Sequence, residues 1–100
     1  MSISKQYLKT KPACKVTFVV PAEQAATAES VAVLGEFNNW QATLMKKQKN
    51  GDFAATLTLP KDQEFQFRYL KDGADWLNDN EADAYVPSPL SYDHNSVLRV

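Results

Sequence analysis

The stretch EFQFRYLKDG, residues Glu64 to Gly73, decides the fold of this chain. Phe65, Phe67 and Tyr69 occupy every second position, which is the period of a β-strand with one buried face. Arg68 stands one position out of phase with them and is therefore expected on the opposite face. Asp72-Gly73 is a turn signal that ends the strand. The stretch predicts a strand that buries aromatic rings in a core and presents its other face to solvent or a ligand.

Shorter alternating segments surround this strand and predict a domain made almost entirely of β-structure. Further strands are expected at residues 14–20, 30–34, 43–49, 53–59, 83–86 and 96–100. The alanine-rich segment 22–29 predicts no more than a turn of helix, because so short a helix is marginal by itself. Asn50-Gly51 is typical of a type I′ hairpin turn, in which both central residues need positive φ.

This succession of short strands and turns predicts an all-β fold, an antiparallel β-sandwich of the immunoglobulin-like type. Residues 1–12 are expected to form an N-terminal arm that ends at Pro12, and residues 13–100 to form the sandwich. Alternation predicts that the core contains Phe18, Val33, Phe53, Leu57, Phe67 and Tyr69.

Composition bounds the possible functions. A chain of 100 residues with 44% apolar residues suits one globular domain. A net charge of −1 argues against a nucleic-acid partner or an anionic membrane surface. Cys14 is the single cysteine and is expected to be a small buried hydrophobe. No apolar run approaches the ~20 residues of a membrane span, so we expect a cytoplasmic protein.

Catalysis and metal binding find little support in the sequence. His94 is the single histidine, and no nucleophile is paired with it by a recognisable motif. Acidic residues crowd one later segment, and they are Asp72, Asp75, Asp79, Glu81 and Asp83. Their spacing does not match a calcium-binding loop of the EF-hand type. We therefore expect a solvated acidic segment, no metal site, no cofactor and no enzymatic activity.

Two tryptophans provide the strongest functional signal. Trp40 and Trp76 each follow a polar, turn-forming run at the end of an apolar segment. One interpretation is that either ring packs into the core. The other is that the two rings form a platform for a ligand with flat apolar faces and polar edges, such as a glucan. Hydrogen bonds from Arg68, Lys71 and Asn95 to sugar hydroxyls would complete such a site.

The motif Val33-Leu34-Gly35-Glu36-Phe37-Asn38-Asn39-Trp40 resembles the opening motif of the family 48 carbohydrate-binding modules. These modules include the glycogen-binding domain of the AMP-activated protein kinase β subunit and the early-set domains of isoamylases and branching enzymes. The likeness continues through residues 67–73, Trp76 to Asp79 and Asn95 to Val100. It implies an immunoglobulin-like sandwich that binds α-1,4-linked glucan.

The resemblance also implies the roles of individual residues. The two stacking tryptophans fall on Trp40 and Trp76, and the basic residue before the Asp-Gly turn falls on Arg68. The apolar residue that inserts through the glucan coil falls on Leu90, and the amide that bonds sugar hydroxyls falls on Asn95. The link from Leu90 to Asn95 is one residue longer than in the kinase domain.

The sequence thus predicts a free-standing, non-catalytic module whose partner is glycogen or a maltooligosaccharide. The alternative is a docking module that binds a glycogen-metabolising enzyme, or a second copy of itself, without binding sugar. Exposure of both tryptophans favours the first interpretation, and a broad apolar patch favours the second.

Overall fold

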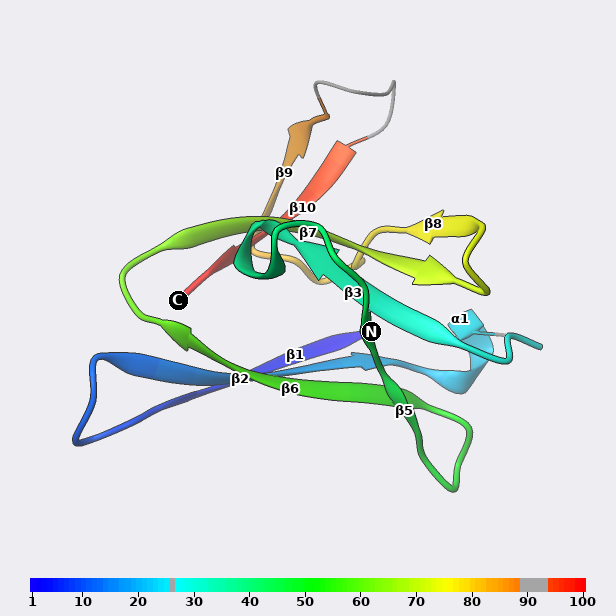
Figure 1. Ribbon diagram of the computed structural model, residues 1–100, viewed down its shortest axis with the longest axis horizontal. Coiled ribbons are helices and arrows are strands. Elements are labelled where there is room, and N and C mark those ends of the chain that lie inside the picture. The colour runs from blue at the N-terminus through cyan, green and yellow to red at the C-terminus, as the bar shows by residue number, and fades with distance from the viewer. Residues whose placement is uncertain (26, 89–93) are drawn as a thin grey trace.

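The computed structural model describes residues 1–25, 27–88 and 94–100, and its strands form two antiparallel sheets packed face to face (Figure 1). Sheet A has the order β1 (Ser2–Tyr7), β2 (Ala13–Val20), β6 (Phe53–Pro60) and β5 (Lys46–Lys47). Sheet B has the order β4 (Thr43–Leu44), β3 (Val31–Gly35), β7 (Glu64–Lys71), β10 (His94–Arg99) and β9 (Ala84–Pro87), and β8 (Asp75–Leu77) also pairs with β7. The predicted all-β sandwich is confirmed.

Helical structure is confined to short pieces among the described residues. They are α1 (Ala22–Ala25) and the 3-10 turn η1 (Glu36–Asn38). In the chain, α1 lies between β2 and β3, and η1 lies between β3 and β4. The position of α1 is where the sequence predicted a turn of helix. No helix in the described part of the chain is both long enough and apolar enough to cross a membrane.

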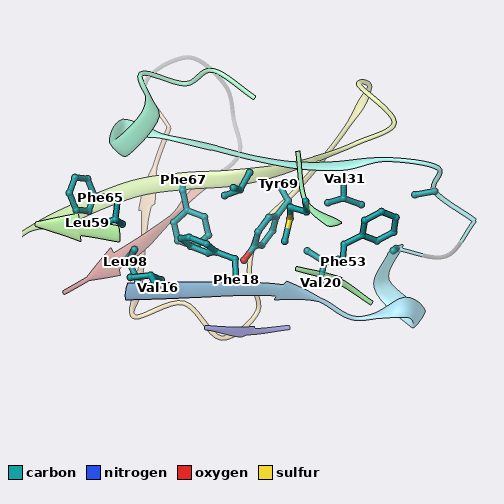
Figure 2. Packing of buried hydrophobic residues seen from close by; sticks show 14 of the residues in the cluster. Val16, Phe18, Val20, Val31, Phe53, Leu59, Phe65, Phe67, Tyr69 and Leu98 are labelled. Carbon is teal, nitrogen blue, oxygen red and sulfur yellow. The ribbon is translucent and has the colours of Figure 1, made fainter. Parts of the chain in front are cut away.

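The core lies between β2 and β7, and aromatic rings fill its centre (Figure 2). Phe18 of β2 lies 5.3 Å from Phe67 and 6.4 Å from Tyr69, measured between ring centroids. Phe37, from η1, packs 5.6 Å from Phe18 and so closes one end of the cluster. The residues predicted to be buried are buried except Leu57, which is half-buried. Alternation along β7 therefore places Arg68 on the outward face of sheet B, as predicted.

Residues 1–12 are not a free arm, because Ser2–Tyr7 forms the edge strand β1 of sheet A. It pairs antiparallel with β2 along its whole length, from Ser2 opposite Val19 to Tyr7 opposite Cys14. Ile3 faces the core opposite Phe18 and packs against the cluster. The strand was hard to predict because the segment is basic and polar, and Ile3 is the large apolar residue in it that packs against the core.

The predicted strand 43–49 is divided between the two sheets. β4 pairs with β3 in sheet B, whereas β5 pairs with β6 in sheet A. Met45, between them, is buried, and its N–H donates a 2.8 Å hydrogen bond to the carbonyl of Val31. The Met45 side chain belongs to the core cluster, so the residue at which the chain crosses from one sheet to the other is anchored in the core.

The hairpin that joins β5 and β6 is not of type I′. Gly51 has φ +92°, but Asn50 is not among the residues with positive φ. The Gly51 N–H donates to the carbonyl of Gln48 at 3.0 Å, and the Gln48 N–H donates to the carbonyl of Asp52 at 2.6 Å. This is a longer loop with a single left-handed residue at its end. The Asn50 side chain accepts from the Asp52 N–H instead.

Candidate functional site

Arg68 lies at the centre of the outward face of sheet B, opposite Leu34 of β3. Its Nε donates a 2.6 Å hydrogen bond to Oδ1 of Asn95 on β10, and Nδ2 of Asn95 donates to Oε1 of Gln66 at 2.9 Å. Arg68 is 8% exposed and Asn95 is 5% exposed. The structure thus brings these two predicted residues together in one network. Both side chains are therefore largely covered by the protein.

Trp76 follows the Asp72-Gly73 turn and belongs to the short strand β8. It lies opposite Leu70 of β7, and Leu70 is two residues from Arg68 on the same face. The indole is 48% exposed. The Asp72-Gly73 turn folds β8 back along β7, because the Ala74 N–H donates to the carbonyl of Lys71 at 3.1 Å. Trp76 therefore stands on the rim of the face that carries Arg68.

Trp40 lies in the connection between β3 and β4 and is 39% exposed. Its φ is +60°, and that of Asn39 is +57°, so two consecutive residues adopt the left-handed conformation. This conformation costs an L-residue about 1–2 kcal/mol. Backbone hydrogen bonds hold it, from the Trp40 N–H to the carbonyl of Gly35 at 2.8 Å and from the Gln41 N–H to that of Asn38 at 3.1 Å.

The Asn38 side chain holds this turn together. Its Oδ1 accepts from the Gly35 N–H at 2.9 Å, and its Nδ2 donates to the carbonyl of Val33 and to Oγ1 of Thr43, both at 3.1 Å. One amide thereby joins the end of β3 to the start of β4. Because Trp40 lies on the loop between these strands, Asn38 fixes where the tryptophan emerges.

One predicted site residue is not brought to this face. Lys71 lies opposite Val31 and Asp75, in phase with the inward-facing Tyr69 and one step out of phase with Arg68. Its side chain is half-buried at the end of β7. Leu90 lies outside the residues that the structure describes, so its predicted role stays a prediction.

The acidic segment is not simply solvated, because Asp79 is fully buried. Its Oδ2 accepts from the Tyr69 hydroxyl at 2.7 Å, and its Oδ1 accepts from the Glu81 N–H at 2.8 Å. The Asp79 N–H donates to Oγ of Ser96 at 3.0 Å. Burial, and then the adjacent Asp79 carboxylate, raise the pKa of Tyr69 well above its usual value. This network ties the segment after β8 to β7 and β10, the strands that carry Arg68 and Asn95.

Other carboxylates of the segment also have structural partners. Oδ1 of Asp72 accepts from the backbone N–H groups of Glu29 and Ser30. Oδ2 of Asp83 accepts from Lys5 and from the Arg99 N–H, each at 2.8 Å. Across residues 1–25, 27–88 and 94–100, no three His, Cys, Asp or Glu side chains converge as a group able to hold a metal ion.

Three residues that position the others were not predicted from the sequence. Gln66 belongs to no chemical motif, Asn38 appeared only as part of the motif Val33 to Trp40, and Asp79 looked like one acid among several. Gln66 could have been found, because it shares the outward phase of Arg68 on β7. Asn38 could have been found as well, because it lies in the motif Val33 to Trp40 and its partners are three to five residues away. Asp79 could not, since its partners Tyr69 and Ser96 are 10 and 17 residues away.

One family model, described as the glycogen recognition site of AMP-activated protein kinase, matches residues 22–87. The matched segment contains Trp40, Arg68 and Trp76 and ends before Asn95. No curated protein matches the chain. Because the model covers more than half of the chain, and because the matched segment holds both tryptophans and the central arginine, the chain belongs to the family of the glycogen recognition site of AMP-activated protein kinase.

Proposed function

We propose that this chain binds α-1,4-linked glucan, such as glycogen or a maltooligosaccharide, on the outward face of sheet B and carries out no catalysis. The observation that carries the proposal is the position of Trp76 beside the hydrogen-bonded pair Arg68 and Asn95. An exposed indole next to a charge-assisted polar network matches the chemistry of a sugar ring, which has flat apolar faces and hydroxyl edges.

Stacking supplies most of the binding free energy in this proposal. If a sugar covers ~80–100 Å² on each of Trp40 and Trp76, burial contributes roughly 4–5 kcal/mol in total before association costs. That corresponds to an affinity near 1 mM, which equals about −4.1 kcal/mol. Hydrogen bonds from the polar network improve it, and each charged one contributes roughly 1.5–3 kcal/mol at most.

Asn95 acts in this proposal mainly by orienting Arg68. Its Oδ1 already accepts from Arg68 and its Nδ2 donates to Gln66, so its amide is committed within the protein. The Arg68 side chain is thereby held in one direction, which lowers the entropy cost of bonding a sugar hydroxyl. The resemblance also assigns Leu90 the insertion through the glucan coil, and that assignment is kept as part of the proposal.

We further propose that the chain acts in the cytoplasm. Glycogen is stored in the cytoplasm, so a glycogen-binding chain is expected to act there. A glycogen-metabolising enzyme is the expected protein partner, because it would bind the same ligand. The expected relatives of the domain are modules of the isoamylase early-set type.

Affinity electrophoresis in gels that contain glycogen tests the proposal. We expect the wild-type chain to be retarded as glycogen increases. Trp76→Ala should weaken binding by about 2 kcal/mol, and Arg68→Ala by about 1 kcal/mol or a little more, while both variants stay folded. Tyr7→Ala is the matched control, because Tyr7 is an exposed aromatic on β1, in the other sheet.

The outcomes separate the two interpretations of the face. Retardation that is lost in Trp76→Ala but kept in Tyr7→Ala supports glucan binding. Wild-type migration that does not change at high glycogen rejects it and favours a protein-docking role.

A further inference from the structure

A row of apolar side chains crosses the outward face of sheet B, starting at Trp76. Trp76 lies opposite Leu70, and Leu70 lies opposite Ala32. Ala32 in turn lies opposite Leu44 of β4. Residues directly opposite each other in antiparallel strands project from the same face. The row therefore spans three strand spacings, about 14 Å, and links the tryptophan to the far edge of the sheet.

The two ends of this row are exposed and its middle is not. Leu44 is 73% exposed and Trp76 is 48% exposed, whereas Ala32 is buried and Leu70 is half-buried. The apolar row is therefore accessible chiefly at its two ends. A single exposed leucine is ordinary on a protein surface. This one is distinguished by its register with the tryptophan.

Beyond Leu44 the surface opens into a depression of about 480 Å³ at the edge of the sandwich. It lies where Met45 carries the chain from sheet B to sheet A, so residues of β4, β5 and β6 line it. Its apolar lining comes from Leu44, Ala54 and Ala55, and its polar lining from Thr43, Lys46, Gln48 and Thr56. Small apolar groups with hydroxyl, amide and ammonium groups around them are the surroundings that suit a sugar ring.

We propose that this depression is a second glucan subsite, reached from Trp76 across Leu70, Ala32 and Leu44. The inference rests on the proposed function, because it assigns a longer path to the same ligand. A trisaccharide on the tryptophan is too short to reach the depression, whereas a heptasaccharide can cover both. The subsite thus makes the affinity depend on glucan length.

Two substitutions remove the subsite and leave Trp76, Arg68 and Asn95 unchanged. Leu44→Ser deletes the apolar end of the row, and Ala54→Gln fills the floor of the depression with a neutral side chain. Thr58→Gln is the matched control, because Thr58 lies on the same face of β6 but does not line the depression. Leu44 is exposed, so its replacement is expected to leave the thermal midpoint unchanged.

Binding of maltotriose and maltoheptaose to each variant is measured by quenching of tryptophan fluorescence. If ~40 Å² of apolar surface is covered at Leu44, Leu44→Ser should weaken maltoheptaose binding about fivefold. We expect a loss of this size in Ala54→Gln, unchanged maltotriose binding in both variants, and wild-type behaviour in Thr58→Gln.

The other results overturn the inference in distinguishable ways. If the variants bind maltoheptaose as tightly as the wild type, the depression is not a subsite, although glucan binding itself stands. Equal losses of affinity for maltotriose and maltoheptaose show that the substitutions act on the site at Trp76 and not on a separate subsite. Failure of the wild type to bind either sugar rejects the proposed function and, with it, the subsite.

Discussion

At the scale of single residues, the proposed binding face depends on side chains to which no ligand contact is assigned. Asn38 makes three hydrogen bonds that close the turn under Trp40. Its neighbour Asn39 makes its contribution through backbone conformation alone, at φ +57°. Two adjacent and chemically identical residues therefore have different functions, and substitution can separate them.

Asn38→Ala should weaken glucan binding although the residue lies away from the indole. The loss of three hydrogen bonds leaves backbone groups of β3 unpaired, at a cost of about 1–3 kcal/mol, and releases the turn that holds Trp40. Asn39→Gly should keep binding and stability, because glycine tolerates positive φ. Glycogen affinity and urea denaturation of both variants check this. Similar losses in the two variants would contradict it.

Tyr69 and Asp79 form a buried pair whose effect on stability depends on pH. Burial and the Asp79 carboxylate raise the pKa of Tyr69, so the folded protein retains the phenol proton at a pH where the unfolded chain loses it. The unfolded pKa is about 10. The stability from this pair is therefore complete below pH ~10, and above it falls by about 1.4 kcal/mol per pH unit.

Tyr69→Phe should destabilise the fold by about 1–3 kcal/mol near neutral pH, because Asp79 loses a buried donor. The difference from the wild type should shrink as the pH rises above ~10, since phenylalanine cannot ionise. Urea denaturation at pH 7 and at pH 11 measures both effects. Tyr7→Phe, at an exposed tyrosine, is the control. A difference that stays constant or grows with pH would show that Tyr69 ionises in the fold.

At the scale of elements, two glycines that look alike in the sequence have different functions. Gly35 ends β3 with φ −168°, an extended conformation that any residue adopts. A Cβ there would lie 2.7 Å from the Gln66 carbonyl oxygen and 2.7 Å from the Phe67 Cβ. Gly73 has φ +69° and no atom within 4 Å of the position of a Cβ. Gly35 is required for space, and Gly73 for backbone conformation.

Gly35→Ala should therefore destabilise the protein by about 3 kcal/mol or more, since backbone and core atoms must move to admit the methyl group. Gly73→Ala should cost about 1–2 kcal/mol from the left-handed conformation alone. Gly73→Asn should recover part of that loss, because asparagine tolerates this region better. Thermal denaturation of the three variants tests the order. A larger effect at Gly73 would refute it.

At the scale of the whole molecule, β1 joins the ends of the chain. Oδ2 of Asp83 accepts hydrogen bonds from Lys5 of β1 and from the Arg99 N–H of β10. Although burial opposes its ionisation, these partners lower the pKa of Asp83 below its usual value. A lowered pKa contributes stability above the unfolded pKa, and that stability is lost as the pH falls through the folded pKa.

Removal of residues 2–7 should destabilise the fold by more than about 2 kcal/mol, because it takes Ile3 away from the core cluster and leaves the backbone edge of β2 unpaired. The destabilisation should be smaller at pH 3 than at pH 7, where Asp83 is ionised and bonded to Lys5. Urea midpoints at the two pH values provide the measurement. An unchanged midpoint at pH 7 would mean that residues 1–12 behave as an arm after all.

The sequence by itself determined the fold class, the core strand β7 and the direction of Arg68, because alternation with a period of two depends only on local geometry. It left open whether the two tryptophans pack inward, and the structure shows both exposed. Only the tertiary structure decided that Ser2–Tyr7 is a strand, that Met45 carries the chain between sheets, and that Asp79 is buried. Each of these depends on contacts between residues distant in the chain, which local patterns do not encode.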